Sequence, residues 1–300
     1  MVRGAAGAPA APLTMDDTTR LTYVGHGTVL IESAGRRLLT DPLLRRWAGP
    51  LRRYTPLPGP DVTANLDAIL LSHLHIDHVD VGSLRLLDRR TPVIVPAPGA
   101  TTLGRLGFSD VREIETGDVV EFGPVSVAAT PARHVVKRYP LMPVSDGVGF
   151  LVSGHHSIYY AGDTGPFTAM ADIAKSLDVA LLPISGWGPT LNADEHLTPL
   201  AAARCLGLLQ PALTVPVHWG TYYPPAMSRL WRGDPRRPAL SYARYTRVLA
   251  PGVAVRILEP GGAVELGPDA LQLGPGAFER GPDALELGPD SPTGTTPARG

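Results

Sequence analysis

A short segment, residues 72–78, carries four potential metal ligands in the order His-x-His-x-Asp-His. It directly follows the apolar run 68–71, Ala-Ile-Leu-Leu, which predicts a buried strand. Imidazole and carboxylate groups packed so closely are costly to bury without a partner, and a divalent metal ion binds both kinds of group. Four ligands at fixed spacing are more specific than a pair, so the segment predicts a metal site rather than a histidine-rich polar loop. The four side chains are His73, His75, Asp77 and His78.

Three further candidate ligands lie later in the chain, and each follows an apolar run: they are His134, Asp163 and His218. The apolar runs before them are typical of buried strands. In α/β proteins the loop that follows a strand often carries functional groups, because the strand is rigid and the loop is free to be shaped. Each of the three is therefore a candidate ligand on such a loop.

Strand-like and helix-like stretches alternate through the middle of the chain. We predict strands over residues 93–95, 119–122, 125–129, 149–152, 158–160, 180–183 and 214–217. We predict helices over 81–88, 167–177 and 199–209, and helix or turn over 225–231 and 241–250. This mixture predicts an α/β or α+β protein built in layers.

Composition limits the possible functions. A chain of 300 residues with 44% hydrophobic content can bury the core of one large domain. The net charge of -1 gives no general basic surface, so nucleic acid is not indicated as a partner. The single cysteine, Cys205, cannot form an internal disulfide, and its apolar surroundings predict a core position. The sequence shows neither a bilayer-spanning apolar run nor the apolar centre of a signal peptide, so we expect a cytoplasmic protein.

The two ends differ from the middle. Residues 1–16 are rich in Ala, Gly and Pro, and we expect them to be disordered before a single large domain over 17–261. Gly-Pro pairs then recur every seven residues, at Gly267, Gly274, Gly281 and Gly288. Proline in each unit excludes a coiled coil, so residues 262–300 are predicted to be a flexible tail. The alternative is a weak docking segment that uses Leu271, Phe278 and Leu285.

Taken together, these motifs resemble the metallo-β-lactamase superfamily of metal-dependent hydrolases. The resemblance covers roughly residues 21–258, and its elements occur in the order of the family. They are Thr40-Asp41-Pro42, the His-x-His-x-Asp-His loop, a later single histidine, Gly162-Asp163-Thr164, and His218 before Trp-Gly-Thr. The resemblance implies an αββα sandwich, in which two mixed sheets are covered by helices and the ligands collect along one edge.

The same resemblance implies two adjacent metal sites. His73, His75 and His134 would hold the first metal ion, and Asp77, His78 and His218 would hold the second. Asp163 would bridge the two ions. Zinc fits the nitrogen-rich ligand set best, while manganese and iron occupy related sites. Two such ions stabilise a hydroxide between them, and Asp77 would both bind one ion and orient that hydroxide.

Other residues are candidates for the surroundings of the metals. Asp41 is either an Asp-Pro turn residue or a partner for a ligating imidazole, and the family motif favours the partner role. His26 lies between two glycines that suggest a bulge or a close backbone approach, and it is either a satisfied histidine in a bulged strand or a pocket residue. The resemblance implies that His26 and His196 line the pocket. His155 and His156 lie in an apparent hairpin turn and are expected to be exposed to solvent.

Two residues bear on the substrate, which we expect to be a small molecule. Arg133 is placed to hold a phosphate or carboxylate, or else it belongs to a solvated loop. Trp187 lines an apolar pocket or simply packs in the core. Neither residue decides between substrates, and the sequence does not indicate an oligomeric state.

Several motifs look like the branch that includes N-acyl-phosphatidylethanolamine-hydrolysing phospholipase D and ascorbate-phosphate lactonase-like proteins. This favours a metal-dependent hydrolase of phosphodiesters or phosphate esters. A lactonase or thioester hydrolase of the same fold is the first alternative. A non-catalytic metal-binding scaffold that docks through its repeat tail is an alternative of another class.

Overall fold

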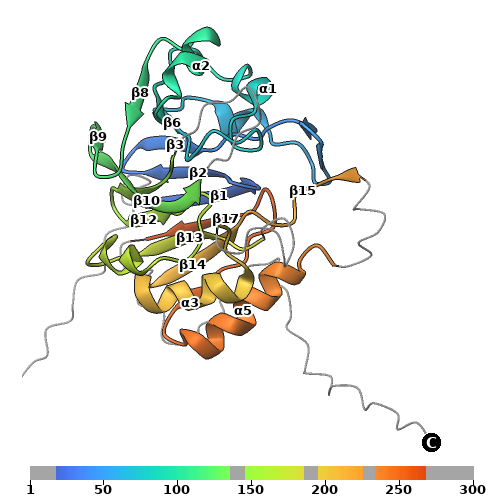
Figure 1. Ribbon diagram of the computed structural model, residues 1–300, viewed down its shortest axis with the longest axis vertical. Coiled ribbons are helices and arrows are strands. Elements are labelled where there is room, and N and C mark those ends of the chain that lie inside the picture. Colours follow the sequence, from blue (N-terminus) through green and yellow to red (C-terminus); the bar gives the residue numbers. More distant parts are fainter. Residues whose placement is uncertain (1–17, 136–145, 186–194, 226–233, 268–300) are drawn as a thin grey trace, which may run out of the picture.

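The computed structural model describes residues 18–135, 146–185, 195–225 and 234–267. Two seven-stranded sheets pack face to face, and helices cover the outer face of each sheet (Figure 1). This is the four-layer αββα arrangement of the metallo-β-lactamase fold, as the family resemblance implied.

The first sheet has the strand order β17-β1-β2-β3-β6-β7-β8. Strands β17, β1, β2 and β3 pair antiparallel, whereas β3, β6, β7 and β8 pair parallel. The parallel part leaves the ends of β3 and β6 side by side, and the metal-ligand segment begins there. The strand bounds are Thr19–Gly25 (β1), Thr28–Ser33 (β2), Arg36–Thr40 (β3), Ala68–Leu70 (β6), Val93–Pro96 (β7), Val111–Ile114 (β8) and Ala263–Leu266 (β17).

The second sheet has the order β16-β14-β13-β12-β11-β10-β9. Its half from β9 to β12 is antiparallel, and its half from β12 to β16 is parallel. The bounds are Val119–Phe122 (β9), Val125–Val135 (β10), Asp146–Ser153 (β11), Ser157–Tyr160 (β12), Val179–Pro183 (β13), Leu213–Val217 (β14) and Ala254–Val255 (β16). Every strand that we predicted in this sheet is present, but β10 continues past the predicted end at residue 129 to Val135, so His134 lies within the strand and not on the loop expected after it.

The helices lie outside the two sheets. Helices α1 (Val81–Leu84) and α2 (Ala100–Arg105) cover the first sheet, and α3 (Pro199–Leu209) and α5 (Arg237–Leu249) cover the second (Figure 1). The bounds of α3 are those predicted, because Thr198 caps it by accepting from the Ala201 N–H and Pro199 occupies its first position.

A small third sheet flanks the first. It contains β4 (Trp47–Ala48), β5 (Leu51–Arg53) and β15 (Tyr222–Tyr223), in the order β15-β5-β4. Its inner face packs Ala48, Leu51 and Tyr222 against Leu43. Because β15 directly follows the loop that carries His218, this sheet ties that loop to the first half of the chain.

Two of the predicted helices are shorter than expected. Residues 167–177 form only a 3-10 turn, Thr168–Asp172, since the preceding Phe167 offers no capping side chain. Helix α1 ends at Leu84, and tighter backbone hydrogen bonds follow, such as Leu87 N–H to the Leu84 carbonyl. Most of 225–231 lies outside the described residues, whereas the helix expected over 241–250 is α5 and begins earlier, at Arg237.

The main core fills the space between the two sheets and continues under α3 and α5. Cys205 belongs to this core, as predicted. A second cluster packs the outer face of the first sheet against α1 and α2. No helix in the described ranges is both long and apolar enough to cross a bilayer.

His156 is buried, with 5% of its surface exposed, so the expectation that it faces solvent is wrong. Its Nδ1 lies 2.9 Å from the Thr19 hydroxyl, where the β11–β12 turn meets the start of β1. The neighbouring His155 is exposed, as predicted.

The boundary expected after residue 261 falls inside the first sheet. Residues 263–266 form β17, which pairs antiparallel with β1 and buries Val264 and Leu266. The physical reason is the alternation of apolar and polar residues just before the first Gly-Pro pair, which suits an edge strand. Residues 1–16 and 268–300 lie outside the described part of the chain.

We therefore predict that two C-terminal truncations differ in stability. Deleting 262–300 removes β17, whereas deleting 268–300 keeps it. Losing the burial of two apolar side chains should lower the free energy of unfolding by about 3 kcal/mol or more relative to the shorter deletion. Urea unfolding of both proteins measures the difference. Equal midpoints and slopes would show that β17 contributes nothing to stability.

Candidate metal centre

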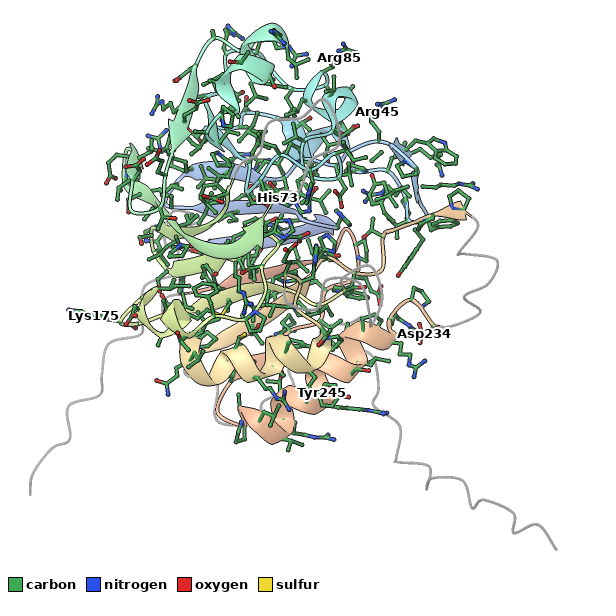
Figure 2. The ribbon with its side chains drawn as sticks, viewed as in Figure 1. Arg45, His73, Arg85, Lys175, Asp234 and Tyr245 are labelled. Carbon is green, nitrogen blue, oxygen red and sulfur yellow. The ribbon has the colours of Figure 1, made fainter. Side chains whose placement is uncertain are left out.

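Loops from both sheets, together with strand β10, bring the seven candidate ligands together. The loop after β6 carries His73, His75, Asp77 and His78, β10 carries His134, and the loops after β12 and β14 carry Asp163 and His218. Figure 2 shows His73 inside the molecule near the junction of the two sheets, far from peripheral residues such as Lys175 and Tyr245. Six of the seven side chains are buried.

Three imidazoles form the first cluster. The Nε2 atoms of His73 and His134 lie 3.0 and 3.1 Å from Nδ1 of His75. The three ring nitrogens therefore converge on one point, as the ligands of a single metal ion must.

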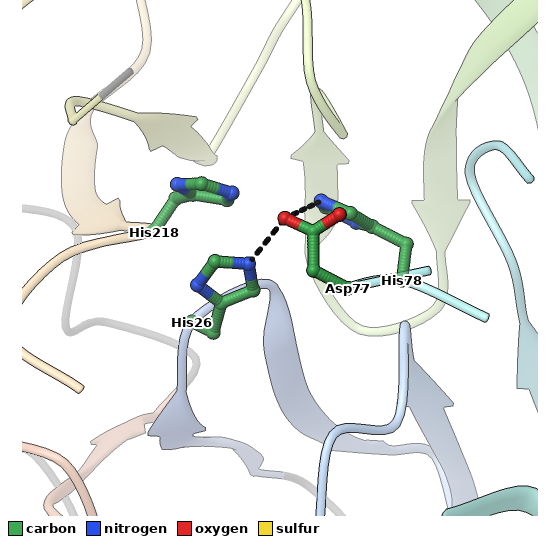
Figure 3. Close-up of side chains that lie close together, drawn as sticks. All are labelled: His26, Asp77, His78 and His218. Atoms are coloured by element: carbon green, nitrogen blue, oxygen red, sulfur yellow. Dashed lines mark hydrogen bonds and ion pairs between the residues drawn. The ribbon is translucent and has the colours of Figure 1, made fainter. Parts of the chain in front are cut away.

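Asp77, His78 and His218 form the second cluster, together with His26 (Figure 3). Asp77 Oδ2 lies 3.9 Å from Nε2 of His78. The buried Nε2 atoms of His78 and His218 have no hydrogen-bond partner. Both nitrogens instead face the carboxylate of Asp163, at 3.4 Å from Oδ2 and Oδ1 respectively.

Asp163 lies between the two clusters. Its carboxylate contacts His78 and His218, and it also lies close to His134 of the first cluster and to His196. His196 Nε2 lies 3.4 Å from Asp163 Oδ2. His196 therefore lies beside the candidate ligands, although it is not one of the seven that the sequence predicted.

The outer nitrogens of the imidazoles fix the tautomers. The Nδ1–H groups of His134 and His218 donate to the carbonyls of Glu195 and Ser185, at 3.2 and 3.0 Å. His73 Nδ1–H donates to the Ser72 hydroxyl at 2.9 Å. Each of these rings then directs the lone pair of Nε2 inward, which is the arrangement that orients histidine ligands in metal proteins.

Burial keeps most of the ligating rings neutral. It lowers the pKa of His75 to about 4, with help from the charge of His134, and it lowers the pKa of His218 to about 4. The pKa values of His73 and His134 also fall, again chiefly through burial. Neutral imidazole is the form that binds metal, so these rings are ready to act as ligands near neutral pH.

The centre has an excess of buried negative charge. Burial alone would lower the pKa of His78, but Asp163 and Asp41 outweigh it and raise that pKa above its usual value. In Asp163 and Asp77 burial works to raise the pKa, and neighbouring histidines outweigh it and lower it. Within the described part of the chain, no lysine or arginine forms an ion pair with these three carboxylates. Convergent nitrogens and uncompensated carboxylates together fit divalent metal ions.

Asp41 anchors the loop after β6 that carries four of the candidate ligands, which we call the metal loop. Its carboxylate accepts from the Ser72 N–H and hydroxyl, at 2.7 and 2.6 Å, and from His78 Nδ1–H at 2.7 Å. The Tyr160 hydroxyl, from the second sheet, donates to it at 2.6 Å. Asp41 therefore contacts a candidate ligand in the manner that the sequence predicted for a partner of ligating imidazoles.

Two residues of this hydrogen-bond network were not predicted from the sequence. Ser72 directly precedes the metal-ligand motif, and Tyr160 ends a strand three residues before Asp163. The local sequence assigns neither residue a role at the site. The proximity of Tyr160 to Asp41 depends on how the two sheets pack, which no local motif encodes.

The Arg133 side chain contacts a backbone carbonyl rather than the candidate ligands. Arg133 lies within β10 rather than on a loop; its side chain is exposed, and its guanidinium donates to the Pro166 carbonyl at 3.3 Å. Trp187 lies outside the described residues.

Comparison with known proteins agrees with the fold. Residues 36–219 match the family model described as the β-lactamase superfamily domain. The chain belongs to the β-lactamase superfamily. Its fold and its convergent imidazoles place it among the metal-dependent hydrolases of that superfamily.

The relatives span several lineages. An uncharacterized protein of Mycobacterium tuberculosis is 30% identical over 251 residues, which cover 74% of this chain and 66% of the relative. A UPF0173 metal-dependent hydrolase of Aeropyrum pernix is 30% identical, over 82% of this chain and 97% of the relative. Among solved structures, the metallo hydrolase Igni18 of Ignicoccus hospitalis is 25% identical, with a TM-score of 0.61 over 83% of this chain and 98% of that chain. The chain thus spans about two thirds of the mycobacterial protein and nearly all of the other two.

We predict that Asp41→Asn weakens metal binding. The amide replaces one acceptor oxygen by an N–H group, so either His78 and Tyr160, which both donate to Oδ2, or the Ser72 N–H, which donates to Oδ1, loses its acceptor. Loss of such an outer partner typically lowers metal affinity about 10–100-fold. A zinc titration against a chromophoric chelator measures this. Asp67→Asn is the matched control, because Asp67 accepts from Arg36 and the Arg37 N–H away from the centre. An unchanged affinity in Asp41→Asn would contradict the assigned role.

Proposed function

We propose that this protein hydrolyses a phosphodiester or phosphate ester of a small molecule with two divalent metal ions, most simply zinc. The observation that carries the proposal is the convergence of five imidazoles and two carboxylates from both sheets at one edge of the sandwich. The anchored outer nitrogens support it further, because they set those rings in the ligating tautomer.

The ligands divide into two sets around Asp163. His73, His75 and His134 would hold one ion, and Asp77, His78 and His218 the other. Asp163 would bridge them, since its carboxylate approaches His134 on one side and both His78 and His218 on the other. When bound, two such ions supply hydroxide near neutral pH and offset negative charge on the leaving oxygen.

Asp77 is the residue we assign to the chemistry itself. Burial works to raise its pKa, but the hydrogen bond from His26 and the charge of His78 outweigh it and keep the carboxylate ionised. An ionised carboxylate can accept a hydrogen bond from the attacking water or hydroxide and so orient its oxygen toward the substrate. The chain supplies this orientation without a protein nucleophile.

His196 supports an oxygen-rich substrate such as a phosphate ester. Its ring centre lies 4.9 Å from that of His134, and its Nε2 faces Asp163. It adds an imidazole beside the seven proposed ligands, where it can contact an oxygen of the substrate. Lactones and thioesters contain fewer such oxygens and serve as the comparison substrates.

We predict about two metal ions per chain in protein purified without chelators. With a panel of chromogenic phosphodiester, phosphate monoester, lactone and thioester probes, the phosphorus esters should be cleaved fastest. Removal of metal by a chelator should abolish hydrolysis, and zinc or manganese should restore it.

The outcomes separate the alternatives. One metal ion per chain, unchanged by added metal, would exclude the dinuclear centre. Faster cleavage of lactones or thioesters would move the assignment to those substrates. Two bound ions without hydrolysis of any probe would favour a metal-binding scaffold.

A further inference from the structure

The turn between β1 and β2 holds His26 in an unusual backbone conformation. His26 has a φ of 56°, in the left-handed region that side-chain-bearing residues seldom adopt. Gly25 before it has a φ of 129°, and a Cβ there would lie 2.7 Å from Cγ2 of Thr221. A Cβ on Gly27 would lie 2.9 Å from the Tyr160 hydroxyl. The two glycines therefore let this turn approach the rest of the site closely, and strained residues of this kind cluster at functional sites.

Two main-chain contacts fasten the turn to the loop that carries His218. The His26 N–H donates to Oγ1 of Thr221 at 3.1 Å. The His218 N–H donates to the carbonyl of His26 at 2.8 Å. Hydrogen bonds to the N–H and to the carbonyl of His26 thus hold its backbone against the loop after β14 of the other sheet.

The side chain of His26 points into the centre (Figure 3). Its Nε2 lies 3.1 Å from Oδ2 of Asp77, and its ring centre lies 3.8 Å from that of His218. The residue is buried, with 6% of its surface exposed. The ring therefore has one fixed direction, toward the carboxylate of Asp77.

The chemistry of this contact gives His26 a definite role. An ionised carboxylate can only accept a hydrogen bond, so Nε2 of His26 must carry the hydrogen. A nitrogen that carries a hydrogen has no lone pair left for a metal ion. Although His26 groups with Asp77, His78 and His218 by distance, its contact with Asp77 and metal ligation by the same nitrogen exclude each other.

We propose that His26 is a positioning residue that orients the Asp77 carboxylate and is not a metal ligand. The inference rests on the proposed function in one respect, the role of Asp77 in hydrolysis. The strained turn sets the direction of the imidazole, and the imidazole leaves Asp77 only one of its possible orientations. The same turn also holds the main chain of His218, so two candidate ligands on different sheets share one support.

A double-mutant cycle tests this role with zinc-loaded protein. His26→Ala, Asp77→Asn and the double variant are compared with the wild-type protein for zinc content, kcat and KM on a chromogenic phosphodiester. His26→Ala should keep the zinc content of the wild type, and its kcat should fall about 10–100-fold with little change in KM. In the Asp77→Asn background the same change should have almost no further effect, because His26 acts through Asp77.

A conservative variant and a control sharpen the cycle. His26→Gln should recover part of the lost kcat, since its amide N–H reaches about as far as Nε2 and still donates. His155→Ala changes an exposed histidine in the β11–β12 turn and should match the wild type. Circular dichroism checks folding. If the alanine variant does not fold, His26→Asn replaces it in the cycle, because asparagine tolerates the left-handed region but is too short to reach Asp77.

Three results would overturn the proposal. A His26→Ala protein that binds one zinc ion fewer than the wild type would make His26 a ligand. Losses in kcat that add fully in the double variant would show that His26 does not act through Asp77. A wild-type kcat in His26→Ala would remove any role. NMR of 15N-histidine-labelled protein keeps this test separate from the proposed function. It shows whether Nε2 of His26 carries the hydrogen and whether that signal changes in Asp77→Asn, and it needs neither metal nor activity.

Discussion

The carboxylate of Asp41 joins the two sheets at the point where the metal centre is built. It lies after β3 of the first sheet, accepts from Ser72 and His78 of the metal loop, and accepts from Tyr160 of the second sheet. A buried carboxylate is stable only when donors surround it, so its four hydrogen bonds require the loop and both sheets to meet in one arrangement. The direction of the His78 ring follows from that arrangement.

The remainder of the centre adds charge that the fold does not balance on its own. Asp77 and Asp163 are buried and have lowered pKa values; of the imidazoles beside them, His78 has a raised pKa, whereas burial lowers the pKa of His218. Divalent ions would offset this charge and would bind the folded protein far better than the unfolded chain. Metal binding should therefore contribute to stability as well as to catalysis.

The sequence was sufficient to predict the layers and the candidate ligands, because both depend on local signals. Apolar runs mark the strands, and the ligands follow those runs at short spacing. The sequence did not predict the contacts between segments that lie far apart along the chain. Tyr160 and Asp41 are 119 residues apart, and their contact depends on sheet packing. His156 looked like a turn residue, and only the approach of β1 buries it. The strand β17 was assigned to the tail because the Gly-Pro repeat after it dominated the composition, although its own alternating pattern indicated an edge strand.

We propose that one carboxylate, Asp163, bridges two metal ions held by separate ligand sets. Anomalous diffraction from crystals of the metal-loaded protein, measured at the absorption edge of the bound metal, tests it most directly. We predict two anomalous peaks, one bounded by His73, His75 and His134 and the other by Asp77, His78 and His218, with Asp163 in contact with both. A single peak in crystals saturated with metal, or a second peak away from Asp163, would contradict the account.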